Sequence, residues 1–252
     1  MADKTKRLRI FAGPNGSGKS TLIKSLSQNF NLNLGYYINS DDIELSLREN
    51  LYLDLSVFNI STTTEELRKF IKDFGMSVTK LDEENIEECF FHEEGKIIIR
   101  DTPINSYLAA DIAEFIRRKL LESETSFSFE TVLSHPSKLA FISQAREQGY
   151  RIYVYYITTE NPGININRVK LRVAKSGHPV KPETIIDRYY RSLKLLFDTV
   201  KLRDRAFLFD NSETYFELVA EITDARKVQV TDLDRKLPEW FITHFYNRKK
   251  NF

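Results

Sequence analysis

The chain has 252 residues, of which 41% are hydrophobic, and this is enough to bury the core of one large α/β domain or of a domain with an insertion. The 37 Lys and Arg residues balance the 36 Asp and Glu residues, so the chain lacks the basic excess of proteins that coat nucleic acid, and nucleic acid is an unlikely partner. Cys89 is the only cysteine, which excludes an intramolecular disulfide and fits a reducing compartment.

The N-terminal residues 1–7 contain no apolar signal region, and no apolar run in the chain reaches membrane length. We therefore expect a cytoplasmic protein without a membrane partner.

The first motif lies between an apolar run at residues 8–12, typical of a short strand, and a helical pattern that begins at residue 21. It fits glycine, four free positions, glycine, lysine and serine, which is the phosphate-binding pattern of nucleotide-binding proteins. Glycines allow the backbone to turn its N–H groups into a nest for anionic oxygens, and the following helix adds the positive end of its dipole. The residues expected to hold ATP are Gly13, Pro14, Asn15, Gly16, Ser17, Gly18, Lys19, Ser20 and Thr21. Lys19 would reach the β- and γ-phosphates, and Ser20 would bind Mg²⁺.

A second short strand is expected at residues 36–38, and it ends in Asn39-Ser40-Asp41-Asp42. Parallel α/β sheets place their ligands at the carboxyl ends of strands, so Asp41 is the candidate base for a substrate hydroxyl. Asp42 is the alternative base, although aspartate there also suits the N-cap of a helix over 43–48. The remaining alternative is that both acids are caps or solvated groups.

Residues 50–105 are expected to form an inserted α+β subdomain. A helix-start signal at 61–66 precedes a helical pattern that Gly75 ends, and residues 90–99 read as a hairpin with a glycine-bearing turn.

The rest of the chain alternates between helical and strand patterns. We expect helices at 111–121 and 139–148, a helix at 165–174, a long helix from Pro182, a short helix at 216–222, strands at 126–133, 152–157 and 206–210, and a solvated tail at 248–250. This order predicts a single P-loop kinase-like α/β domain over 1–252, with a parallel sheet of about five strands flanked by helices.

The acid on the metal side has two candidates. Glu130 is the favoured metal ligand, because it ends a strand directly before a helix in the alternating core, and Asp101, which follows the apolar run 97–99 within the expected insertion, is the alternative. Either could position Mg²⁺, and either could be a plain charged end of a strand.

The positively charged side chains that would contact the γ-phosphate come from the region 163–203, which is expected to be a helical lid. Arg168 and Arg172 are spaced to share one helix face, and Arg188 and Arg191 lie one turn apart on the next helix. Between the helices, residues 175–179 would form a flexible corner. Closure would bring guanidinium groups to the γ-phosphate, while the alternative is a solvated basic face.

Four segments in order resemble the zeta toxin family of P-loop kinases. They are residues 12–21, 38–41, 127–134, and a block that runs from 156 through 165–169 and 177–178 to 188–193. The likeness covers about residues 6–45 and 106–212, and the stretch 50–105 has no match to the family core. Val132 and Ser176 stand where the family often has threonine and glycine.

The resemblance implies a kinase that uses ATP and Mg²⁺ to phosphorylate a sugar hydroxyl of UDP-N-acetylglucosamine, and an antitoxin-like protein inhibitor that blocks the ATP site. Lys19 would bind phosphate, Ser20 would bind magnesium, and Asp41 would be the base. Glu130 and Thr131 would line the substrate site, where Arg168 is also expected. Arg172 and Arg188 resemble the arginines that stabilise the moving phosphate.

Two other functions stay open from the residues alone. One is a nucleotide-gated ATPase that regulates a partner without a small-molecule acceptor. The other is a polynucleotide kinase, which would need a basic groove that leads to Asp41.

Overall fold

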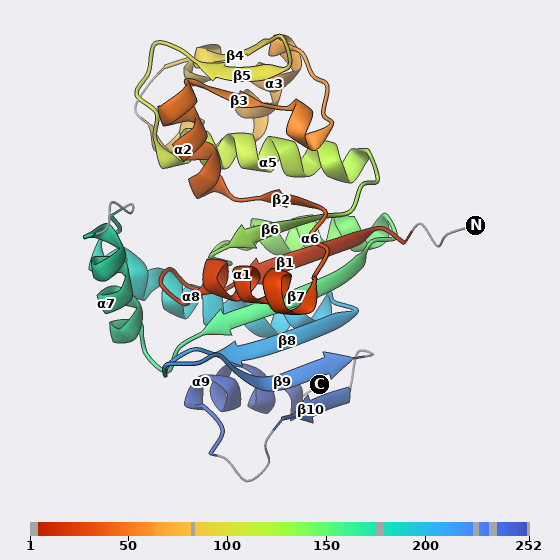
Figure 1. Ribbon diagram of the computed structural model, residues 1–252, viewed down its shortest axis with the longest axis vertical. Coiled ribbons are helices and arrows are strands. Elements are labelled where there is room, and N and C mark those ends of the chain that lie inside the picture. The colour runs from red at the N-terminus through yellow and green to blue at the C-terminus, as the bar shows by residue number, and fades with distance from the viewer. Residues whose placement is uncertain (1–4, 82–83, 175–178, 224–226, 232–235, 251–252) are drawn as a thin grey trace. The chain divides into compact units, whose positions relative to one another are not determined.

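The structure is a computed structural model that describes residues 5–81, 84–174, 179–223, 227–231 and 236–250. The chain divides into two compact units (Figure 1). The first comprises residues 1–34 and 128–252, and the second comprises residues 35–127. The expected insertion at 50–105 lies within the second unit. Among the described residues, no helix combines the length and the apolar character needed to cross a membrane.

The first unit is built on a mainly parallel sheet, which confirms the predicted α/β fold. Its described strands, in spatial order, are β10 (Lys227–Val230), β9 (Glu217–Thr223), β8 (Arg205–Asp210), β7 (Arg151–Thr158), β1 (Arg7–Ala12) and β6 (Phe127–Thr131), the last of which begins in the second unit. Strands β1, β7 and β8 are parallel, whereas β9 and β10 add antiparallel pairs at the edge. The strand β7 is the centre of the core because Ile152, Val154, Tyr156 and Ile157 are fully buried.

Helices cover both faces of this sheet. The helices of this unit are α1 (Lys19–Phe30), α6 (Ser137–Glu147), α7 (Pro162–Val173), α8 (Pro182–Lys201), and a C-terminal segment of α9 (Glu239–Phe241), a π-helical turn η3 (Ile242–Tyr246) and α10 (Asn247–Lys250). Figure 1 shows α1 on one face and α8 on the other. The hydroxyl of Tyr156 on β7 pairs with Ser192 of α8 at 3.0 Å, and the Tyr156 ring packs near Trp240 of α9.

The prediction of a helix over 216–222 is wrong, because β9 occupies this stretch and pairs antiparallel with β8. The register of this pair shifts between Leu208 and Phe209, so Val219 and Ala220 are both buried and the alternation expected of a strand is interrupted. With β9 and β10 the sheet also exceeds the predicted number of about five strands.

The prediction of a solvated tail at 248–250 is wrong for Arg248. Its guanidinium donates to the carbonyl oxygen of Lys194 at 2.9 Å and to the carboxylate of Asp198 at 3.2 Å. Arg248 therefore fastens α10 to α8.

The second unit has its own small sheet and helices. Its described elements are β2 (Tyr36–Ile38), α2 (Ser40–Asn50), β3 (Tyr52–Asp54), η1 (Ser56–Phe58), α3 (Thr64–Phe74), α4 (Ser77–Lys80), η2 (Ile86–Cys89), β4 (Phe90–Glu93), β5 (Lys96–Ile99) and α5 (Ser106–Glu122). The antiparallel sheet has the order β3-β5-β4, and the predicted hairpin turns at Glu94 and Gly95, both with positive φ.

The core of the second unit forms along α5. Its apolar face buries Leu108, Ile112, Phe115, Ile116 and Leu120. The predicted helix α3 begins after Thr63, which accepts a hydrogen bond from the backbone N–H of Glu66, and it ends at Gly75.

Candidate active site

The loop between β1 and α1 has the shape of a phosphate nest. Gly18 precedes α1 in the left-handed conformation, and among the described residues no side chain caps the helix and no acid lies in its first turn. The first N–H groups of α1 and its dipole can therefore serve an anionic ligand. The loop is also fixed to the sheet, because the N–H of Gly13 donates to the carbonyl oxygen of Thr131 at 3.2 Å.

Two loop glycines are required by close approach as well as by conformation. A Cβ atom at Gly16, where φ is 75°, would lie 2.6 Å from the carbonyl oxygen of Asn165. A Cβ atom at Gly18, where φ is 97°, would lie 2.3 Å from Nδ2 of Asn211. Any other residue would be strained at these φ values, and its Cβ atom would displace the backbone of Asn165 at position 16 or the side chain of Asn211 at position 18.

The ammonium group of Lys19 lies against its own loop. Its Nζ donates to the carbonyl oxygens of Gly13 at 2.9 Å and of Pro14 at 3.0 Å. A positive charge is thus held beside the nest, where the phosphates of a nucleotide would bind.

The residues Ser20 and Glu130, expected to bind metal, are in contact. The Ser20 hydroxyl, in the first turn of α1, donates to Oε2 of Glu130 near the end of β6 at 3.1 Å. Two neighbouring oxygen ligands of an octahedral Mg²⁺ lie about 3.0 Å apart, since each is about 2.1 Å from the ion. The two oxygens are therefore spaced to share one magnesium ion.

Within the described residues, no three His, Cys, Asp or Glu side chains gather into a metal site. The alternative acid, Asp101, follows β5 in the second unit.

Thr131 is held by backbone contacts at the end of β6. Its carbonyl oxygen accepts from Gly13, and its hydroxyl accepts from the N–H of Leu133 at 3.0 Å. These contacts join the expected substrate residues to the phosphate loop.

Two asparagines that we did not predict hold the loop from the other side. Nδ2 of Asn165, at the start of α7, donates to the carbonyl oxygen of Asn15 at 2.7 Å. Nδ2 of Asn211, directly after β8, donates to the carbonyl oxygen of Ser17 at 2.7 Å. A signal for Asn211 was present, because polar residues at the carboxyl end of a parallel strand mark the ligand edge of the sheet.

Arg168 has a different environment from the one expected. Its guanidinium donates to the carbonyl oxygens of Asn211 at 2.6 Å, Ser212 at 3.5 Å and Glu213 at 3.3 Å. These contacts use the guanidinium to hold the loop after β8, and the expected role of Arg168 in substrate binding stays a prediction.

Helix α8 reaches the phosphate loop through Arg188. Nη1 of Arg188 lies 3.5 Å from Oδ1 of Asn15. The neighbouring Tyr189 hydroxyl donates to the carbonyl oxygen of Thr159 at 2.6 Å, and burial raises the pKa of Tyr189, so it stays a neutral donor. Arg188 is thus placed at the loop by a fixed helix.

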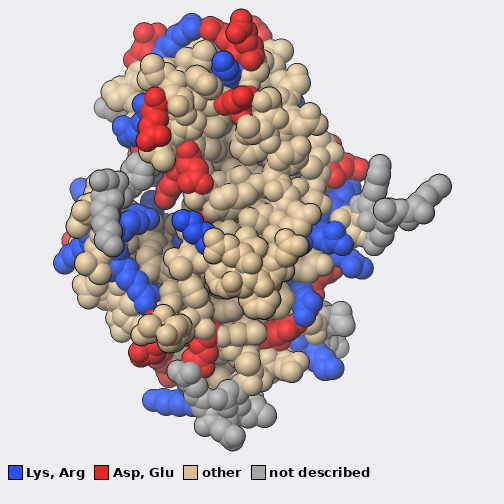
Figure 2. All heavy atoms as spheres, viewed as in Figure 1, with Lys and Arg blue, Asp and Glu red and all other residues tan. Residues whose placement is uncertain are grey.

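The helix α7 carries Arg172 in its exposed last turn. Figure 2 shows Lys and Arg atoms gathered on the side of the molecule where Figure 1 draws α7. The four residues 175–178 of the expected corner lie outside the described residues.

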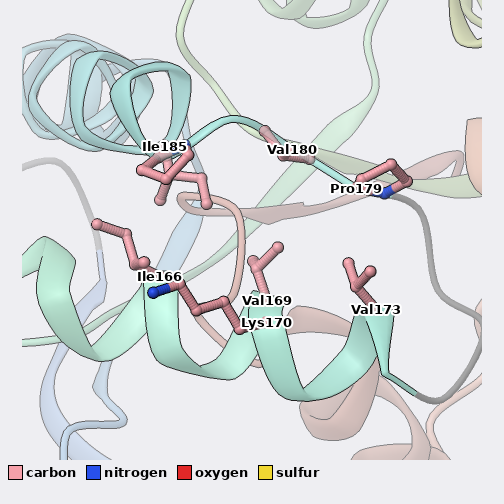
Figure 3. Close-up of a pocket in the computed structure, with 8 residues that line it drawn as sticks. Ile166, Val169, Lys170, Val173, Pro179, Val180 and Ile185 are labelled. Atoms are coloured by element: carbon pink, nitrogen blue, oxygen red, sulfur yellow. The ribbon is translucent and has the colours of Figure 1, made fainter.

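An apolar pocket of about 260 Å³ lies between α7 and α8 (Figure 3). Its walls include Ile166, Val169 and Val173 from α7, with Val180 and Ile185 on the other side. The start of α7 is thus tied to the phosphate loop through Asn165, and an apolar pocket lies between its later turns and α8.

Asp41 lies in the second unit, in the first turn of α2. The N-cap of α2 is Asn39, whose Oδ1 accepts from the N–H of Asp41 at 3.0 Å. The interpretation of Asp42 as the cap is therefore wrong. Asp41 and Asp42 are both exposed, so either carboxylate is accessible to a substrate.

A family model described as zeta toxin matches residues 64–232, which is more than half of the chain. The match includes Glu130, Thr131, Arg168, Arg172 and Arg188. It also begins inside the stretch 50–105, so the expectation that this stretch lies outside the family is wrong from residue 64 onward. No curated protein matches the chain.

Solved structures with low sequence identity share the fold. The chain is similar to a structure of the complex AvrRxo1-ORF1:AvrRxo1-ORF2 with sulphate ions, with 13% identity and a TM-score of 0.55 over 91% of this chain and 62% of that one. A structure of the same complex with ATP gives 12% identity, a TM-score of 0.55 and the same coverage. This chain thus spans less than two thirds of the chain that it matches there.

A structure from the PezAT chromosomal toxin-antitoxin system of Streptococcus pneumoniae has 15% identity and a TM-score of 0.48, over 86% of this chain and 73% of that one.

Proposed function

The chain belongs to the zeta toxin family, and on that premise we propose that it is an ATP-dependent kinase that phosphorylates a hydroxyl group of a small molecule. The observation that carries the proposal is the phosphate loop with Lys19 on its carbonyl oxygens and with Ser20 in contact with Glu130. A loop N–H nest, a cation and a pair of oxygen ligands are the parts that phosphoryl transfer requires.

The loop would bind the phosphates of ATP, and Lys19 would contact the β- and γ-phosphates. Ser20 and Glu130 would hold Mg²⁺, which would neutralise negative charge on the phosphate oxygens. The structure with ATP of a distant fold relative is in keeping with this use of the fold.

In the proposed reaction, a carboxylate oxygen of Asp41 accepts the proton of the acceptor hydroxyl. The hydroxyl oxygen forms a bond to the γ-phosphorus, the bond between that phosphorus and the bridging oxygen breaks, and ADP leaves with the electron pair. Arg188 and Arg172 would stabilise the charge on the moving phosphoryl group. The proposal requires the second unit to present Asp41 to the γ-phosphate.

We propose a sugar nucleotide such as UDP-N-acetylglucosamine as the acceptor, on the strength of the family. An antitoxin-like inhibitor remains a prediction from the family in the same way.

The function is tested by incubating the protein with ATP, Mg²⁺ and a panel of sugar nucleotides, and by detecting a phosphorylated acceptor by mass spectrometry. The proposal expects one member of the panel to gain a phosphate, and Lys19→Ala to abolish the product. Hydrolysis of ATP with no phosphorylated acceptor would favour a nucleotide-gated ATPase.

A further inference from the structure

We propose that Asn165 and Asn211 are positioning residues that hold the phosphate loop in its ligand-binding shape, an inference that rests on the proposed use of this loop to bind ATP. The two side chains come from different elements, since Asn165 lies in the first turn of α7 and Asn211 follows β8. They meet the loop at two carbonyl oxygens, those of Asn15 and Ser17. We call this pair of contacts the amide clamp.

The orientation of both amides follows from their partners. A carbonyl oxygen only accepts hydrogen bonds, so the group that faces Asn15 O or Ser17 O at 2.7 Å must be the NH₂ of the amide. The other atom of the Asn165 amide supports this orientation, because its Oδ1 accepts a hydrogen bond from the hydroxyl of Thr159. Asn165 is fully buried and Asn211 nearly so, which leaves little access for water to replace these contacts.

The clamp fixes the direction of N–H groups because a trans peptide is planar. In such a peptide the N–H of one residue points away from the carbonyl oxygen of the residue before it. Drawing Asn15 O toward Asn165 therefore turns the N–H of Gly16 the opposite way. Drawing Ser17 O toward Asn211 does the same for the N–H of Gly18. The clamp thus orients two N–H groups of the nest before a phosphate arrives, which lowers the ordering cost of binding.

The glycines of the motif fit the clamp. A side chain at Gly16 would collide with the backbone of Asn165, and one at Gly18 would collide with the amide of Asn211. Gly16 and Gly18 are therefore the places where the clamp closes on the loop.

Both asparagines also contact residues outside the phosphate loop. Thr159 supports Asn165, and the carbonyl oxygen of Thr159 accepts from Tyr189 on α8. Arg168 holds the backbone of Asn211 at 2.6 Å. This supporting layer explains the use of Arg168, and it connects α7, α8 and the loop after β8 to the geometry of the nest.

The test is a titration of the full chain with ATP and Mg²⁺, for the wild type and for Asn165→Asp and Asn211→Asp. Aspartate keeps the shape of asparagine but loses the donor and turns a carboxylate oxygen toward the carbonyl. We expect each substitution to raise the Kd for ATP about 10- to 100-fold. Gly16→Ala, which displaces the loop from Asn165, should produce a similar loss by a second route.

The matched control is Asn161→Ala. Asn161 caps the same helix α7, since its Oδ1 accepts from the N–H of Gly163 at 3.0 Å, and among the described residues its side chain makes no hydrogen bond to the phosphate loop. It should lower the unfolding free energy while leaving the Kd unchanged. The Kd of the wild type for ATP tests the proposed function, whereas the ratio of the variant Kd to the wild-type Kd tests the clamp. Wild-type affinity in both aspartate variants, or equal losses of affinity in Asn161→Ala, would overturn the clamp.

Discussion

The Ser20 hydroxyl donates to Oε2 of Glu130 across 3.1 Å, and this contact joins the first turn of α1 to the end of β6. The two side chains are 110 positions apart in the chain, so the fold itself assembles the proposed magnesium site. The contact predicts that both residues act through the metal.

Ser20→Ala and Glu130→Gln should each raise the Mg²⁺ concentration that gives half-maximal activity, by about 10-fold or more, because each removes a metal ligand. The measurement is activity against Mg²⁺ at saturating ATP. Ser25→Ala, on the same helix, is the control and should leave the curve in place. An unchanged curve in both variants would remove these residues from the metal site.

Arg188→Ala should lower kcat about 100-fold or more, because a guanidinium beside the loop stabilises charge that develops during transfer. The control is Arg191→Ala, one turn further along α8, which pairs with Asp187 on the exposed surface. Its kcat should match that of the wild type. Equal activities in the two variants would assign Arg188 to the solvated basic face.

The pocket between α7 and α8 gives a test of the proposed lid. Val169→Phe should fill part of the hollow and hinder any movement of α7 against α8, so kcat should fall while the Kd for ATP holds. Leu171→Phe adds a similar ring on the exposed face of the same helix and serves as the control. A wild-type kcat in Val169→Phe would argue against a moving α7.

The second unit contains a buried acid with a defined dependence on pH. The carboxylate of Asp111 accepts from the N–H groups of Met76 at 2.6 Å and Ser77 at 2.9 Å, and burial raises the pKa of this carboxyl above its ordinary value. The folded state therefore binds this proton more tightly than the unfolded state does. The contribution of Asp111 to stability is greatest below the ordinary pKa of about 4 and falls as the pH rises through the raised one.

Asp111→Asn removes the titration, so the unfolding free energy of the wild type relative to the variant should decrease as the pH rises from about 4. Urea unfolding of both proteins at several pH values measures this difference. A difference that stays constant, or one that increases with pH, would contradict the assignment.

Much of the fold could be predicted because the signals are local. The phosphate-loop glycines, the Thr63 cap of α3 and the Glu94-Gly95 turn each act within a few residues of their own position. The strand β9 escaped prediction because its identity depends on pairing with β8, and the register shift buries two successive residues and interrupts its alternation.

The residues of the candidate site also fall into those with a local sequence signal and those that depend on long-range contacts. Lys19 and Ser20 follow from a motif, whereas Asn165 and Asn211 contact the loop across 150 and 194 positions. The end of a parallel strand marks Asn211 as a residue of the ligand edge, but no local pattern names the loop carbonyl oxygens as the partners of either asparagine. Arg168 shows the opposite case, because a basic residue on an expected lid face is used to hold backbone carbonyl oxygens.

The most direct test of the account is the rate of acceptor phosphorylation by Asp41→Asn, measured beside Asp42→Asn and with the Kd for ATP determined for both. We expect Asp41→Asn to bind ATP as the wild type does and to lose phosphoryl transfer by about 100-fold or more, because no carboxylate receives the hydroxyl proton. Asp42→Asn should stay active. Full transfer activity in Asp41→Asn would contradict the proposed mechanism.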